Sequence, residues 1–110
     1  MNLLEIENLL DATQSSDPKI RKASLIKLCA CHVRANKPQI WDRIFQMQTD
    51  SDAGVRSVVL HNLCDGSPHE RKDEVVNAVE KLAKDSNLKL RRRARNALAV
   101  YRRTGSINTE

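Results

Sequence analysis

The chain has 110 residues, 40% of them apolar and 30% charged, with three glycines and three prolines. This composition excludes a low-complexity chain, a collagen-like chain and disorder throughout, and the length is that of one small domain, residues 1–110. No apolar run approaches the roughly 18 residues of a membrane span, and acidic side chains stand near the start where a signal peptide would carry basic ones. We therefore expect a soluble, cytoplasmic protein with no membrane partner.

The formal net charge of +5 is unevenly distributed along the chain. Residues 87–110 contain seven basic residues and one acidic residue, whereas residues 1–86 contain twelve basic and thirteen acidic ones. The basicity therefore belongs to the C-terminal element and does not indicate a generally cationic protein that coats nucleic acid.

An internal repeat organises the chain. The segments Ser16–Arg21, Ser51–Arg56 and Ser86–Arg91 align with one another, and each begins 35 positions after the last. The alignment extends without a gap in both directions, which gives repeat units of approximately 1–35, 36–70 and 71–105.

Each unit is predicted to form two helices. The first helix has apolar residues at the spacing of 3, 4 and 7 that is typical of an amphipathic helix, as at Ile40, Ile44 and Met47. The second helix carries one apolar stripe in each unit, formed by Ile20, Ser24, Leu28 and Cys31, then Val55, Val59 and Leu63, then Leu90, Ala94, Leu98 and Tyr101. No segment has the alternation of a half-buried strand, so the predicted fold class is all-α.

Local signals mark where these helices begin and end. Asp17 before Pro18 is a typical N-cap, and Ser67 followed by Glu70 is a capping box. Helix ends are predicted at Asn36, Gly66 and Gly105.

These residues resemble the HEAT repeat family, including its bacterial short-repeat branch, and the resemblance covers almost the whole chain. It rests on Asp17-Pro18-Lys19-Ile20-Arg21, on Asp52-Ala53-Gly54-Val55-Arg56 and on the apolar positions around them, while the third unit departs from it at Asn87 and Leu88. The resemblance implies a right-handed α-α superhelix, a solenoid of three helical hairpins with the second helices on the concave side. It also implies links between neighbouring repeats through Asp17, Asp52, Arg21, Arg56 and Arg91.

The resemblance further implies which residues would face a partner on the concave surface. They are Lys22, Ile26, Cys29, Val33, Ser57, His61, Cys64, Arg92, Asn96 and Arg103. In this row Ile26, Val33 and the two cysteines form an apolar strip that leads to a basic end, which suits an acidic or amphipathic segment of another protein. The predicted function is that of a non-catalytic protein-protein interaction module or scaffold subunit. A solvated face with scattered apolar atoms is the alternative for this row.

The C-terminal basic patch has two interpretations. It consists of Lys89, Arg91, Arg92, Arg95, Arg102 and Arg103. A terminal repeat must expose polar side chains where a further repeat would pack, and Glu80, Arg93 and Arg95 replace apolar residues of the earlier units in this way. Alternatively, the patch binds the backbone of duplex DNA or RNA. Against this, the few aromatic residues lie on core stripes and are not placed to stack on bases.

Enzymatic and metal chemistry find little support in the sequence. No serine, histidine and carboxylate constellation or glycine-rich phosphate loop stands out, so we predict no enzyme, no cofactor and no metal. A zinc site of Cys29, His61 and Cys64 is conceivable, but the C-x-x-C spacing is absent and half-buried thiols are the favoured interpretation. Cys29 and Cys31 are expected on different sides of one helix.

The N-terminal repeat is predicted to associate. Leu3, Leu4 and Leu10 belong to its first helix, and no charged residue replaces them on the outer side. We expect a second copy, forming a homodimer, or another partner to cover this end.

Overall fold

The computed structural model describes residues 1–33 and 37–110, and no strand occurs within these ranges, which confirms the all-α class. The predicted helix end at Asn36 lies outside them. The elements in chain order are α1 (Leu3–Ala12), α2 (Pro18–Lys27), α3 (Ala30–Val33), α4 (Pro38–Gln46), the 3₁₀ turn η1 (Met47–Thr49), α5 (Ala53–Leu63), the 3₁₀ turn η2 (His69–Arg71), α6 (Lys72–Leu82) and α7 (Leu88–Thr104). In the part of the chain that is described, none of these helices is both long and apolar enough to cross a membrane.

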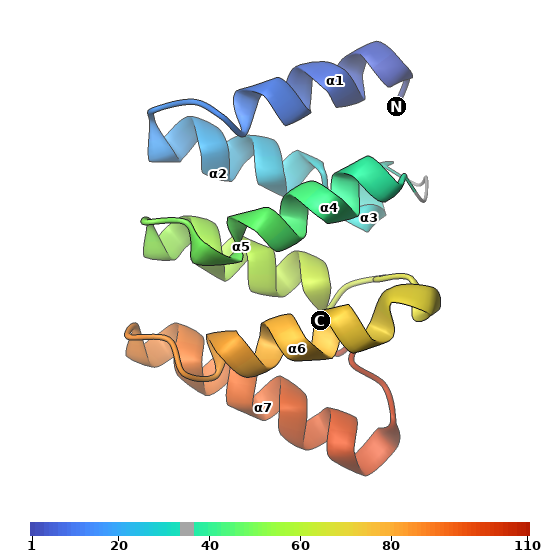
Figure 1. The fold of residues 1–110 in the computed structure, drawn as a ribbon, viewed down its shortest axis with the longest axis vertical. Helices are drawn as coiled ribbons and strands as arrows, with labels where there is room; N and C mark the ends of the chain where they lie inside the picture. The colour runs from blue at the N-terminus through green and yellow to red at the C-terminus, as the bar shows by residue number, and fades with distance from the viewer. Residues whose placement is uncertain (34–36) are drawn as a thin grey trace.

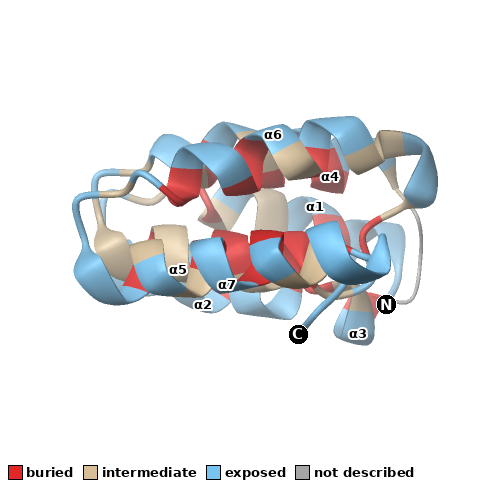
Figure 2. Ribbon diagram, turned by 90° about the horizontal axis from the view of Figure 1, so that it is seen from below, coloured by how far each residue is buried: buried red, intermediate tan, exposed pale blue. Residues whose placement is uncertain are grey.

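The long helices follow one another along the longest axis of a molecule that measures 39 × 28 × 17 Å. Figure 1 shows α1 at one end and α7 at the other, with each helix lying beside the next one in the chain. Seen along that axis, the helices form two layers, with α4 and α6 in one and α2, α5 and α7 in the other (Figure 2). Second helices of successive units therefore lie side by side, and the contacts between α2 and α5 and between α5 and α7 agree with this view.

Buried apolar side chains fill the space between the layers. Ile6, Ile44 and Val79 on the first helices of the units belong to one cluster with residues such as Val59 and Ala94 on the second helices. Burial of each large aliphatic side chain contributes roughly 1.5–3 kcal/mol, so this shared cluster is the main favourable term in the stability of the stack.

The predicted stripe of the first unit is partly wrong. Ile20 is 47% exposed and Cys31 is exposed, whereas Leu25 is fully buried. The equivalents of Ile20, which are Val55 and Leu90, are buried because a preceding helix pair covers each of them. Cys31 leaves the stripe because the predicted helix is interrupted.

A side chain from α5 accompanies this interruption. In a continuous α-helix the carbonyl oxygen of Leu25 would accept the backbone N–H of Cys29. Here the Asn62 side-chain Nδ2 donates to that oxygen at 2.9 Å. The helix α2 ends at Lys27, and the backbone N–H of Cys29 donates to the carbonyl oxygen of Ile26 instead. Insertion of a side chain into the helical hydrogen bonds is a recognised cause of such breaks.

The turn before each second helix has a similar set of hydrogen bonds in all three units. Asp17, Asp52 and Asn87 are the N-caps of α2, α5 and α7, and each side chain accepts a backbone N–H of the first helical turn. Arg21, Arg56 and Arg91 each donate from Nη1 to a carbonyl oxygen six residues earlier, on Ser15, Asp50 and Asp85. The repeat of 35 residues thus recurs as a repeated local structure.

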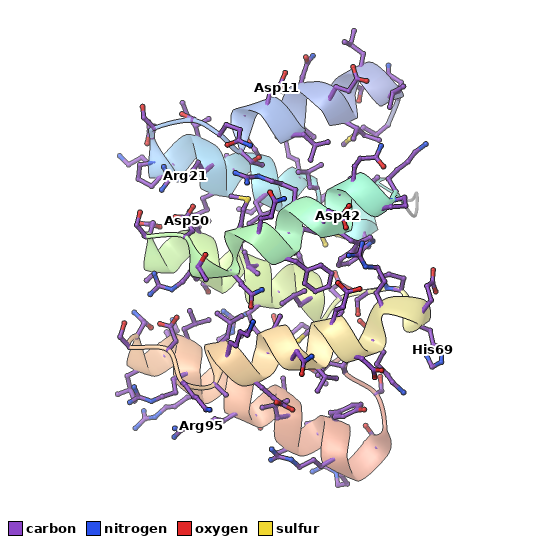
Figure 3. The ribbon with its side chains drawn as sticks, viewed as in Figure 1. Asp11, Arg21, Asp42, Asp50, His69 and Arg95 are labelled. Carbon is purple, nitrogen blue, oxygen red and sulfur yellow. The ribbon has the colours of Figure 1, made fainter. Side chains whose placement is uncertain are left out.

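Two arginines also join consecutive units, as the resemblance implied, but their partners are not the expected ones. Arg21 forms a bidentate ion pair with Asp50, in which its Nε and Nη2 each lie 3.0 Å from a carboxylate oxygen. Arg56 does the same with Asp85, at 2.8 and 3.0 Å. Figure 3 shows Arg21 reaching from α2 toward Asp50 in the next turn. Asp17 and Asp52 cap helices, and Asp50 and Asp85, whose shared spacing of 35 residues is visible in the sequence, carry the links.

The capping box predicted at Ser67 is wrong. The chain passes through η2 before α6 begins at Lys72, and no side chain caps that helix. Ser67 is buried, and its backbone N–H and its hydroxyl both donate to the Asn108 side chain near the end of the chain. Gly105 ends α7 as predicted, in the left-handed conformation with φ +77°.

Candidate functional site

A groove of about 210 Å³ lies between α2, α3, α5 and α7. Five of the residues predicted to face a partner line it, namely Lys22, Ile26, Cys29, Ser57 and His61. The other lining residues are Cys31, His32, Gly54, Val58 and Arg93. The groove is therefore lined by five of the ten residues that were predicted to face a partner.

The apolar strip predicted for this row is not formed. Val33 and Cys64 are 3% and 0% exposed, and Cys29 is 2% exposed, so that only Ile26 of the strip is open to solvent, at 44%. The helix break after Lys27 changes the direction of the side chains that follow it. Cys64 is the C-cap of α5, and burial raises the pKa of its thiol to about 12. Ile26 and the nearly buried Val58 supply the apolar character of the groove.

Arg93 belongs to the groove, contrary to its expected place on the outer end of the last repeat. Its Nη1 donates to the Ser57 hydroxyl on α5, and its Nη2 bonds both carboxylate oxygens of Glu110 at 2.8 and 3.0 Å. The repeat places Arg93 at the position that Val58 occupies one unit earlier, and the structure shows that both side chains line the groove. Residues of the second helices α2, α5 and α7 therefore line one groove together.

The segment that follows α7 also belongs to the site, and the sequence analysis did not consider it. Ile107 is 3% exposed, Asn108 binds Ser67, and the backbone N–H of Glu110 donates to the carbonyl oxygen of Cys64 at 2.9 Å. The chain thereby returns from the end of α7 to the end of α5 (Figure 1). Glu110 then stands between Arg93 and His61, whose Nδ1 lies 3.1 Å from its carboxylate.

The remaining predicted residues lie on α7 outside the groove. Arg92, Asn96 and Arg103 are exposed, as is Lys89, while Arg91 is half-buried and bonds to Asp85 as described above. None of these five is among the residues that line the groove.

Arg95 and Arg102 lie at the outer end of the molecule, where a cap was predicted. They line an open hollow of about 560 Å³ together with Glu80, Ala83, Lys84 and Leu98. Arg95 donates from Nε to the carbonyl oxygen of Ala83 at 3.0 Å, and Figure 3 shows it at the end of the stack beside α7. Charged side chains around Leu98 are expected where a helix pair ends a stack, because no further pair covers its apolar residues.

The zinc ligands that the sequence suggested are only partly brought together. Cys29 and His61 meet at one end of the groove. Among the described residues, the potential ligand atoms that lie within 4.8 Å of one another are those of Cys29, Cys31 and Asp65, and Cys64 is not one of them. Cys29 and Cys31 do not point to different sides, because the helix is broken between them. Burial, together with hydrogen bonds to Cys31 and Asp65, raises the pKa of the Cys29 thiol to about 12.

Searches against protein families, curated proteins and solved structures found no match to this chain.

Proposed function

We propose that the chain is a short HEAT-like solenoid of three helical hairpins that serves as a non-catalytic protein-binding module. The proposal of this architecture is supported by the three turns with similar hydrogen bonds, by the links from Arg21 to Asp50 and from Arg56 to Asp85, and by the alignment of α2, α5 and α7 in one layer. A stack of this kind presents its second helices as one continuous surface to a partner.

The partner that fits the groove is an acidic, partly apolar segment of another protein. The observation that carries this proposal is the position of Glu110, an acidic side chain of an extended segment that Arg93 and His61 hold at the edge of the groove. Lys22 and Ile26 of α2 also line the groove, and Ile26 is 44% exposed. Carboxylates of a partner would pair with Lys22, and apolar side chains would cover Ile26 and the accessible part of Val58.

Binding to synthetic peptides tests this proposal directly. The probes are short peptides with alternating acidic and apolar residues, and the same peptides with glutamine in place of each acid. We expect the acidic peptides to bind the wild-type chain with an affinity that falls as salt is raised, and Lys22→Glu to lower it at least about tenfold. Lys84→Glu is the matched control, because Lys84 lies at the outer end of the molecule. Equal binding of acidic and glutamine peptides, or full binding by Lys22→Glu, would overturn the proposal.

Binding of duplex DNA or RNA is the competing outcome. It rests on the exposed side chains of Arg92 and Arg103 and predicts affinity with a steep salt dependence, which Arg92→Ala and Arg103→Ala would each reduce by about one unit of slope. A titration at two salt concentrations decides between the two functions, and tight binding of nucleic acid without binding of acidic peptides would replace the first with the second.

The outer side of α1 is proposed as a contact with a second copy or another protein. Leu3 and Leu4 are 55% and 64% exposed, and Met1 is 46% exposed. Sedimentation at high concentration is expected to reveal association that Leu4→Glu abolishes, and a wild-type chain that stays monomeric would remove self-association from the proposal.

A further inference from the structure

Four side chains with metal-binding atoms meet where α2 is interrupted. The Cys29 Sγ lies 3.0 Å from the Cys31 Sγ and 3.2 Å from the Asp65 Oδ2. The His61 Nε2 lies 3.7 Å from the same sulfur of Cys29 and 3.4 Å from Asp65. These atoms come from two consecutive units of the stack.

Two local features of the backbone, a helix break and a glycine turn, bring the four residues together. In a continuous helix, Cys29 and Cys31 would be about 200° apart, and the break beside Asn62 removes that separation. On the other side, Gly66 has φ +78°, and a Cβ placed there would stand 3.1 Å from the Cβ of Ala30. The turn that carries Asp65 thus packs closely against the start of α3.

The four distances given above are each within about 1 Å of those on a tetrahedral zinc ion. The ligand atoms of Cys29, Cys31 and Asp65 all lie within 4.8 Å of one another, and His61 approaches this group on the side of Cys29 and Asp65. Zinc binds thiolate sulfur at about 2.3 Å and imidazole nitrogen or carboxylate oxygen at about 2.0–2.2 Å. On one tetrahedral ion, two sulfurs therefore stand about 3.8 Å apart, a sulfur and a nitrogen or oxygen about 3.6 Å, and a nitrogen and an oxygen about 3.4 Å. To reach these values, the sulfurs of Cys29 and Cys31 must move about 0.8 Å apart, and Cys31 must turn toward His61.

The surroundings of His61 also match those of a metal-bound histidine. Its Nδ1 faces the Glu110 carboxylate at 3.1 Å, and Arg93 holds that carboxylate in place. With the proton on Nδ1 donated to Glu110, the lone pair of Nε2 is directed toward Cys29 and Asp65. In zinc sites, a histidine ligand commonly donates its other ring N–H to a carboxylate, and this hydrogen bond fixes the ring orientation and the tautomer.

We propose that Cys29, Cys31, His61 and Asp65 bind one zinc ion and clamp α2 and α3 of the first unit to α5 of the second. With four protein ligands, the ion has no open position, so its role is structural. Binding releases one proton from each thiol to solvent and changes no oxidation state. The cation offsets the negative charge that two thiolates and a carboxylate would otherwise accumulate beside one another. Cys29, Cys31 and His61 also line the groove of the proposed peptide site, but zinc binding needs no peptide, so either proposal can fail without the other.

The experiment is a titration of the reduced, chelator-treated chain with cobalt(II), which reports the ligands by its absorption spectrum. We expect saturation at one cobalt per chain, the bands of a tetrahedral ion and a thiolate charge-transfer band, with zinc displacing the cobalt and raising the melting temperature. Cys31→Ser and Asp65→Asn are expected to weaken binding, and Cys31→Ser to reduce the charge-transfer band. Cys31 is exposed, so its replacement leaves the metal-free fold intact.

Two further variants make the test specific. Cys64→Ala removes the buried thiol outside the cluster and is expected to keep the full cobalt spectrum, with circular dichroism as the check that the chain is folded. Glu110→Gln keeps all four ligands and is expected to lower affinity about 10- to 100-fold. A reduced chain without a charge-transfer band, a band unaffected by Cys31→Ser, or a disulfide between Cys29 and Cys31 in the protein purified from cells would overturn the proposal.

Discussion

Arg21 and Arg56 each tie one helix pair to the next through a carboxylate that lies 29 residues further along the chain. The Arg56 and Asp85 side chains are 14% and 9% exposed, so that solvent screens this pair little. Each arginine also donates to a carbonyl oxygen of its own turn, so one guanidinium group fixes both the turn and the neighbouring unit. Bidentate arginine-carboxylate pairs are among the stronger charge-assisted hydrogen bonds.

Removal of the Arg56 side chain tests this link. We expect Arg56→Ala to lower the free energy of unfolding by about 1.5–3 kcal/mol, because the carboxylate of Asp85 then keeps only the backbone N–H of Asn87 and the carbonyl of Asp50 loses its Arg56 donor. Arg92→Ala, at an exposed position on α7, is the control, with an expected change within about 0.5 kcal/mol. Urea unfolding measures both variants, and equal stabilities would contradict this role for Arg56.

The acid stability of the chain follows from the same carboxylates. Hydrogen bonds from Arg56 hold the pKa of Asp85 below its ordinary 3.8 despite burial. Burial alone would raise the pKa of Asp50, but hydrogen bonds from Arg21 and from the backbone N–H of Asp52 lower it overall. Because both folded-state values lie below the unfolded ones, the contribution of each group is fully present above the unfolded pKa and is lost as pH falls through the folded one.

We therefore expect the free energy of unfolding to show no loss from these two groups between about pH 7 and pH 5, and to decline below about pH 4. In the double variant Asp50→Asn, Asp85→Asn, the stability difference from the wild type should narrow as pH falls. Urea unfolding across this range measures the difference, and a gap that stays constant down to about pH 3 would show that the lowered pKa values do not contribute.

At the scale of the elements, the beginnings of the second helices could be predicted from the sequence and the break in the first of them could not. Asp17 caps α2 as predicted because its side chain accepts a nearby backbone N–H group, a local property that short segments encode. The break after Lys27 involves Asn62, a residue of the next unit, and Leu28-Cys29-Ala30 contains no glycine or proline to mark it. The wrong predictions for Cys29, Cys31 and Val33 all concern residues that follow this break.

The two glycines with positive φ offer a matched comparison of helix ends. Gly66 and Gly105 have φ +78° and +77°, but a Cβ at Gly66 would meet Ala30 at 3.1 Å, whereas a Cβ at Gly105 would meet nothing within 4 Å. Gly105→Ala is expected to cost about 1–2 kcal/mol for the left-handed backbone alone, and Gly66→Ala to cost more. Thermal unfolding measures both, and adding Ala30→Gly should recover part of the Gly66→Ala loss. Equal costs would show that the approach of α3 is not tight.

At the scale of the whole molecule, the order of the helices followed from the repeat, but the groove did not. The period of 35 residues predicted which residues are equivalent, and Leu28, Leu63 and Leu98 are all buried as this requires. The groove includes Arg93, a charged side chain at the position that Val58 occupies in the second unit, and Arg93 is held by Glu110 of the segment after α7. A sequence repeat predicts the residues that its units have in common, whereas the groove depends on residues that differ between the units.

Nuclear Overhauser effects between helices test the arrangement on which the groove depends. The account predicts contacts of α2 with α5 and of α5 with α7, including the Asn62 side-chain amide near Leu25, and no contact between α1 and α7. Contacts between α1 and α7, or the absence of contacts between α2 and α5, would contradict it, because the helices would then not form a stack with a groove along its second helices.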